Sequence, residues 1–278
     1  MNAENLDYLQ NRLKYLGFGE DGPLNQELEE NVRQGLQEFQ LLTDALFEDC
    51  RMEAKLFFSK SSEKDIYYFK KYDAQLQYSG SVEADKAQTF YIYKKWGFTF
   101  KEAFNLLEGR AVYKMLVRPK TDTEYPAWSQ LDFSEKNLFG NYKCTEYREN
   151  HGYDLEKVLN IYPIVELQDD ELKKSLIRSL QRGNIHPVHF LKNNKTEKLF
   201  IEANPRNRLI NIFPQATRVA VRTEELAKEK DPFPATPQPA METEPLVVEE
   251  PDIPPPDSEA PEPPDPGPGK PPRKRTYK

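Results

Sequence analysis

Apolar residues recur every three to four positions over the first forty residues, which is the spacing of an amphipathic helix. The first run stops at Gly17 and Gly19, and Asp21-Gly22-Pro23 predicts a turn before the second run. We read the two runs from Leu6, Leu9, Leu13 and Leu16, and from Leu24, Leu28, Val32, Leu36 and Phe39. The pattern therefore predicts an N-terminal helical hairpin over residues 1–42.

From Glu53 the apolar period changes to two, which indicates β-strands. One helix interrupts them: Thr99 and Glu102 have the spacing of a capping box, and Gly109 marks the end of the helix. Residues 43–150 thus form a first unit, with strands expected at Lys55–Ser59, Asp65–Lys70, Gln88–Lys94, Trp128–Phe133 and Asn141–Tyr147.

Residues 151–222 repeat this order of elements. Helices are expected after Asp154 and after Asp169 or Asp170, the second of them ending at Gly183. Strands follow at Val188–Leu191, Lys198–Ala203 and Leu209–Phe213. Both units run helix, glycine, connecting strand and hairpin, so the sequence predicts an α+β fold in which two related helix-plus-antiparallel-strand units follow the helical hairpin.

Composition separates the C-terminal residues 223–278 from the rest of the chain. Of the 23 prolines, 16 lie in residues 231–278, where the net charge is −5, whereas residues 1–230 carry −2. This segment is rich in proline and acidic residues and has few apolar side chains to bury. Their burial cannot offset the conformational entropy that the chain would lose on ordering, so we expect a disordered tail of polyproline character. Pro268, Pro271 and Arg273 form a PxxPxR spacing that can dock into an aromatic groove, and an anionic partner for the basic end 270–278 is an equal alternative.

Signatures of catalysis are weak throughout. Gly17-Phe-Gly19-Glu-Asp-Gly22 matches a dinucleotide-binding fingerprint in letters, but a helix precedes it where a strand is needed, so we interpret it as a helix end and a turn. His186 and His189 would point to opposite faces of a strand, which disfavours a metal site. Cys50 and Cys144 are expected to be free thiols. We predict no catalytic residue, cofactor or metal; the chain is more consistent with a non-enzyme, although an unrecognised enzyme stays open.

Basic and aromatic residues offer one candidate binding surface. Arg110, Lys114 and Trp128 follow the helix of the first unit, and Arg182, Arg206 and Arg208 flank the second unit. If the two units are equivalent, these six residues line one groove, where stacking and phosphate contacts would suit single-stranded nucleic acid. Acidic residues intervene, so a mixed solvated surface is the alternative.

No apolar stretch approaches the roughly 20 residues that cross a bilayer, and the N-terminus lacks the features of a signal peptide. We therefore expect a cytoplasmic protein without a membrane partner.

Four segments together carry a resemblance: Leu106–Val112, Trp128–Phe133, Gly152–Leu155 and Phe200–Pro205. They resemble hypothetical proteins encoded on conjugative transposons and related mobile elements of gut bacteria, over most of residues 1–215. The resemblance implies residence in a bacterial cytoplasm and an accessory role beside DNA transfer, and it implies no activity. We expect a non-enzymatic binding or adaptor protein with a protein partner and no small-molecule substrate. The alternative is an accessory protein that binds single-stranded or duplex nucleic acid.

Overall fold

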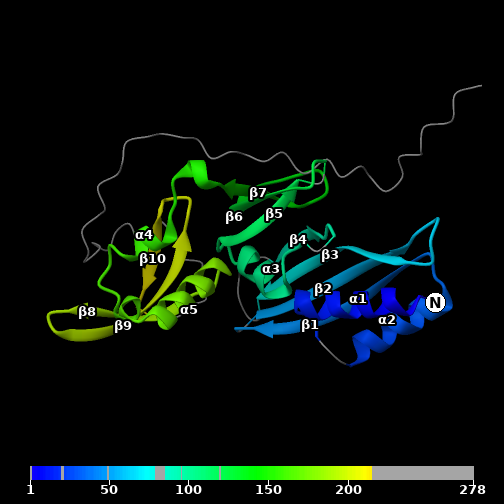
Figure 1. The fold of residues 1–278 in the computed structure, drawn as a ribbon, viewed down its shortest axis with the longest axis horizontal. Helices are drawn as coiled ribbons and strands as arrows, with labels where there is room; N and C mark the ends of the chain where they lie inside the picture. The colour runs from blue at the N-terminus through cyan, green and yellow to red at the C-terminus, as the bar shows by residue number, and fades with distance from the viewer. Residues whose placement is uncertain are drawn as a thin grey trace, which may run out of the picture. The chain divides into compact units, whose positions relative to one another are not determined.

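The described part of the chain combines helices with antiparallel strands, as predicted (Figure 1). The structure, a computed structural model, describes residues 2–19, 22–48, 50–78, 85–94, 96–118 and 120–214. The N-terminal elements are α1 (Ala3–Leu16), α2 (Pro23–Gln34), β1 (Glu38–Phe47), β2 (Cys50–Lys60), β3 (Tyr67–Tyr78), β4 (Lys86–Tyr91) and α3 (Phe100–Leu107). The following elements are β5 (Val112–Arg118), β6 (Thr123–Lys136), β7 (Tyr142–Tyr147), η1 (Glu149–His151), α4 (Leu155–Leu159), η2 (Val165–Gln168), α5 (Asp170–Gln181), β8 (His186–Lys192), β9 (Lys195–Asn204) and β10 (Leu209–Phe213).

The first two helices end where glycine allows a left-handed backbone. Gly17 (φ 82°) terminates α1, which confirms the interpretation of this glycine as a helix end, and Gly35 (φ 71°) terminates α2. The helical assignment of Phe39 was wrong: it lies in β1, which pairs with β2 from Glu38 to Phe47. Leu36 and Phe39 continue the apolar spacing of α2 only by chance, because Gly35 has already ended the helix.

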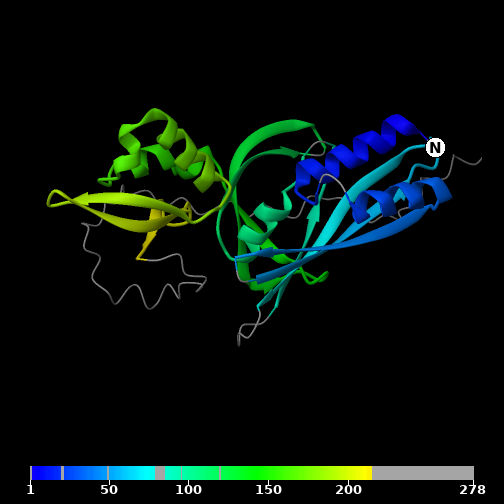
Figure 2. The ribbon, with the colours of Figure 1, turned by 90° about the horizontal axis from the view of Figure 1, so that it is seen from below.

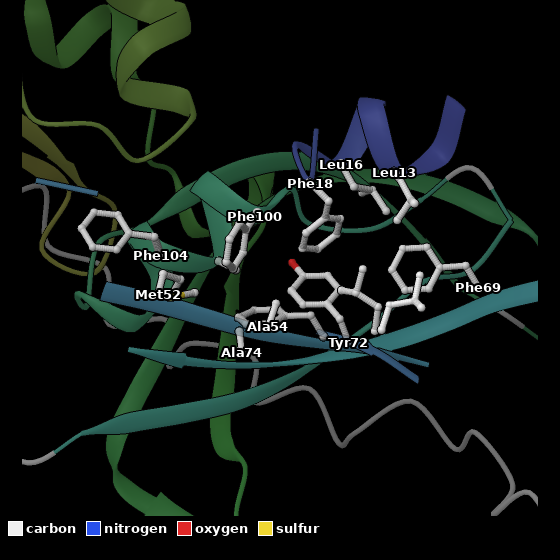
Figure 3. Packing of buried hydrophobic residues seen from close by; sticks show 14 of the residues in the cluster. Leu13, Leu16, Phe18, Met52, Ala54, Phe69, Tyr72, Ala74, Phe100 and Phe104 are labelled. Carbon is white, nitrogen blue, oxygen red and sulfur yellow. The ribbon is translucent and has the colours of Figure 1, made fainter. Parts of the chain in front are cut away.

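Strands β1 to β4 form an antiparallel sheet in sequential order, which we call sheet A. The helices α1, α2 and α3 bury their apolar residues against one face of it (Figures 1 and 2). Figure 3 shows Tyr72 at the centre of this core, between the sheet and the rings of Phe18 and Phe100. The Tyr72 hydroxyl donates to the carbonyl oxygen of Phe98 at 2.8 Å, so the polar tip of the ring is satisfied inside the core.

Two three-stranded antiparallel sheets follow, in the orders β5-β6-β7 and β10-β9-β8. Each comes directly after a helix and a left-handed glycine: α3 with Gly109 (φ 87°) and α5 with Gly183 (φ 79°). A second hydrophobic cluster packs Trp128 and Tyr147 of the first of these sheets with α4, α5 and the second sheet. The order of elements in residues 100–147 is therefore found again in residues 170–213.

The C-terminal tail expected from the sequence, including Pro268, Pro271 and Arg273, lies beyond residue 214, where the described part ends. Of the helices within the described ranges, none combines the length and the apolar character that crossing a membrane requires.

Among the glycines in the described ranges, Gly183 has the least room for a side chain. A Cβ atom there would lie 3.0 Å from the Ala111 carbonyl oxygen, the Asn105 Cβ and the Val112 Cγ2. Gly140 has a similar φ of 81°, but a Cβ atom at that position would have no neighbouring atom within 4 Å. Substitution of either glycine strains the backbone, but only substitution of Gly183 also causes steric overlap. A comparison of the two therefore separates these two contributions to the loss of stability.

We expect Gly183→Ala to lower the free energy of unfolding by about 3 kcal/mol, because left-handed strain and overpacking add. Gly140→Ala is the matched control and should lose only about 1 kcal/mol, from strain alone. Urea denaturation of both variants measures the difference. Equal losses at the two positions would show that the contact around Gly183 is loose.

Candidate functional site

The predicted groove of six basic and aromatic residues is not formed. Arg110 and Trp128 are only 5% and 4% exposed, so they do not contribute to a surface, and the prediction was wrong for them. Trp128 is buried because it packs between Tyr113 and Tyr153 in the second hydrophobic cluster. Arg110 is buried because its guanidinium binds the Glu48 carboxylate and the Asn105 side chain inside the fold.

The other four residues occupy separate places. Lys114 forms a salt bridge with Glu102, the capping-box carboxylate of α3. Arg182 lies at the end of α5. Arg206 is half-exposed, donates to the Tyr147 hydroxyl at 3.2 Å and lies 3.5 Å from the Asp132 carboxylate. Arg208 is partly buried in the turn between β9 and β10.

Arg110 is instead the centre of a buried polar cluster. Its guanidinium donates to both carboxylate oxygens of Glu48, at 3.0 and 2.9 Å, and to the Asn105 side chain at 2.9 Å. The Glu108 and Glu202 carboxylates lie 3.6 and 4.0 Å away. Because these partners come from the end of β1, from α3 and from β9, the cluster ties three segments together.

The three carboxylates around Arg110 differ in acidity. Burial opposes the charge of Glu48, but the hydrogen bonds and the charge of Arg110 outweigh it and lower its pKa. Burial raises the pKa of Glu108, and it also raises the pKa of Glu202, because Arg110 offsets it only in part. The cluster therefore holds one strongly paired carboxylate and two that bind protons more readily than usual.

A raised pKa in the folded state means that Glu108 contributes stability below its ordinary pKa of 4.5 and loses it as the pH rises through the folded value. We expect Glu108→Gln, which cannot ionise, to gain stability relative to the native chain between about pH 5 and about pH 8. Chemical denaturation at both pH values measures this gain.

Glu48→Gln is the matched control, because the lowered pKa of Glu48 gives the opposite sign. Its carboxylate stabilises the fold above pH 4.5, so this variant should lose more stability at neutral pH than in acid. If the stability difference between Glu108→Gln and the native chain is the same at both pH values, the pKa of Glu108 is not raised in the folded state.

The outer face of sheet A, which faces away from the helices, carries the candidate binding site. Cross-strand pairing places two rows of side chains on it: Leu42, Lys55, Asp73 and Thr89, and Asp44, Glu53, Gln75 and Ala87. Most of these residues line a hollow of about 390 Å³, together with Arg51. Since residues of all four strands contribute, only the correct register of the whole sheet creates the hollow.

Charges of both signs lie inside the hollow. Arg51 bridges the carboxylates of Asp44 and Glu53, each at 3.4 Å, and Thr89 donates to Asp73 at 2.7 Å. Lys55 lies opposite Asp73 in the strand register. The lining offers carboxylates, an amine and a guanidinium, which can form ion pairs and hydrogen bonds with a bound partner.

Exposed apolar side chains flank this face on two sides. Leu42 and Leu46 of β1 are 69% and 76% exposed. Beyond β4, the turn between β6 and β7 exposes Leu138 and Phe139 almost completely, and Asn141 after this turn accepts a hydrogen bond from Thr89 N at 2.7 Å. Apolar groups beside a polar hollow are typical of protein-binding surfaces.

Two of the three histidines, His151 and His189, have hydrogen-bond partners within the fold. Glu166 accepts from the backbone N of His189 and contacts its Nδ1 at 2.7 Å, and His151 Nε2 lies 3.0 Å from the Pro205 carbonyl oxygen. Within the described ranges, no group of three or more His, Cys, Asp or Glu residues is placed to hold a metal ion.

Cys50 and Cys144 are free thiols, as predicted. Burial raises the pKa of Cys144 to about 12, so this thiol is protonated at neutral pH, and the side chain of Cys50 is fully buried and inaccessible to reagents. Both should stay unmodified by iodoacetamide in the native protein and become alkylated in denaturant. Mass spectrometry of tryptic peptides measures this, and rapid native alkylation of Cys144 would contradict its placement.

Comparison with known proteins identifies no relative: no protein-family model, no curated protein and no solved structure matches the chain.

Proposed function

We propose that this chain is a non-enzymatic binding or adaptor protein that holds a protein partner on the outer face of sheet A. The observation that carries this proposal is the hollow of about 390 Å³ on a sheet face that α1, α2 and α3 leave open. Small-molecule sites are mostly enclosed, whereas this hollow is open, and ionic groups line it together with Leu42 and three alanines. A protein surface can satisfy both the charges and the exposed leucines beside them.

The proposed setting is the cytoplasm of a bacterium, where the chain would act as an accessory factor of a mobile element. The support is the resemblance of four sequence segments to hypothetical proteins of conjugative transposons. The common order of elements in residues 100–147 and 170–213 further supports two related units that arose by duplication.

The nucleic-acid alternative is weaker. It now rests on Arg182, Arg206 and Arg208, because Arg110 and Trp128 are buried and Lys114 is paired. Stacking of bases requires exposed aromatic rings beside basic groups, and the predicted aromatic residue of the groove is inside the core.

Reversal of one charge in the hollow tests the proposed function. Affinity isolation from a bacterial host with the full chain should capture a protein partner, and Lys55→Glu should weaken that complex about tenfold, because it places a third carboxylate beside Glu53 and Asp73.

Lys198→Glu, on an exposed strand position outside the hollow, is the matched control and should bind like the native chain. Calorimetry with the captured protein gives the affinities. If Lys55→Glu binds as well as the native chain, the hollow is not the binding site.

A further inference from the structure

Strand β1 is the outer strand of sheet A, and within the described residues it pairs with β2 alone. The backbone N of Lys60 donates to the Gln37 carbonyl oxygen at 2.8 Å. In an antiparallel pair every second residue bonds to the neighbouring strand, so this bond shows which residues of β1 bond to β2. The odd-numbered residues of β1 bond to β2. The N–H and C=O groups of Glu38, Gln40, Leu42, Asp44 and Leu46 consequently point to the open edge.

Two other edge strands, β4 and β8, are protected against pairing. At β4, Thr89 N donates to the Asn141 side chain, and Gln88 exchanges hydrogen bonds with Tyr142. At β8, His189 N donates to Glu166, and Pro187 has no N–H to offer.

Strand β1 lacks these protections within the part of the chain that the structure describes. Its ten residues contain no proline, glycine or lysine, and its pairing with β2 runs without a bulge. Leu42 and Leu46 add exposed apolar surface at this edge. A long, regular and partly apolar edge strand is a template for another strand, and folded proteins do not normally leave one bare.

We propose that β1 pairs antiparallel with β1 of a second copy of this chain, about a two-fold axis at Leu42. The pairing joins two sheets of four strands into one continuous sheet across the dimer. It uses the backbone edge of β1, whose Leu42 and Asp44 side chains also line the hollow, and it goes beyond the proposed function.

The charges of β1 select this register. With Leu42 opposite the partner's Leu42, Gln40 faces the partner's Asp44 as amide to carboxylate, and Glu38 faces the partner's Leu46. A shift that places the axis at Leu41 sets Glu38 against the partner's Asp44, and an axis at Asp44 sets two Asp44 carboxylates against each other. An axis at Thr43 pairs residues 39–47 but sets Glu38 against the partner's Glu48 just past the strand. The Leu42 register is preferred because it pairs residues 38–46 without opposing like charges.

The core face of β1 fits the same pairing. The register places Phe39 beside the partner's Ala45 and Leu41 beside the partner's Thr43. Phe39 and Leu41 are buried, whereas Thr43 and Ala45 are only partly covered in the single chain. Pairing would therefore extend the apolar face of the sheet across the axis and cover the half of β1 that its own helices leave accessible.

Removal of an outward N–H tests the proposal. Light scattering after size exclusion should give twice the 32.5 kDa of one chain for the full-length protein. Gln40→Pro removes two symmetry-related hydrogen bonds between the copies and none to β2, so it should weaken the dimer roughly 30-fold.

Ala87→Pro is the matched control. Ala87 lies on β4, two positions before Thr89. Its N–H, like that of Thr89, points away from β3, and it lies at the edge of sheet A opposite to β1. This variant should dimerise like the native chain, and circular dichroism melts confirm that both proline variants are folded. A native chain that stays monomeric at all concentrations, or a Gln40→Pro variant that dimerises normally, overturns the proposal.

Disulfide trapping tests the register without a proline. Leu42→Cys places two thiols opposite each other at the axis, so mild oxidation should link most of the protein as a covalent dimer. Leu172→Cys, at a comparably exposed leucine on α5, should remain unlinked. Equal linkage of the two variants would rule out the Leu42 axis.

Discussion

The buried guanidinium of Arg110 is the interaction on which the arrangement of the described elements depends. It binds Glu48 just after β1, Asn105 on α3, and lies within 4.0 Å of Glu202 on β9. Asn105 in turn donates to the Arg182 carbonyl oxygen and to Asn184, next to the close approach at Gly183. A buried cation must keep its partners, so these segments can shift relative to one another only if the whole cluster breaks.

Such a cluster specifies geometry more than it adds free energy. Three carboxylates surround Arg110, and Lys101, 3.7 Å from Glu48, is a nearby second cation. Ionising all three groups in a buried site is costly, and the raised pKa of Glu108 and Glu202 expresses that cost. An apolar replacement of the entire cluster would be close to neutral in stability. It would, however, lose the directional hydrogen bonds that join Asn105 of α3 to Arg110 and to the end of α5 at Arg182 and Asn184.

Signals between neighbouring residues predicted the helices and strands well. Contacts between residues far apart in the chain could not be predicted from the sequence. The capping box of Thr99 and Glu102, the cap at Asp169 and the stop at Gly183 all depend on neighbours within a few residues, and the structure contains each of them. The burial of Arg110 depends on Glu48, 62 positions away, so no local pattern could reveal it. The hollow was equally invisible, because it exists only once four strands are in register.

Sheet A also explains why both proposed contact surfaces, the outer face and the β1 edge, belong to the same sheet. Helices cover one face, and Asn141 and Tyr142 close the edge at β4, so the outer face and the β1 edge are what the described residues leave open. Leu42 belongs to both surfaces, since it lines the hollow and stands at the proposed axis. If β1 pairs with a second copy, two hollows meet along that axis, and an elongated or two-fold symmetric partner would contact both at once. Binding at one hollow would then raise the effective concentration of the partner at the other hollow. This would compensate for the weak affinity of a single shallow site.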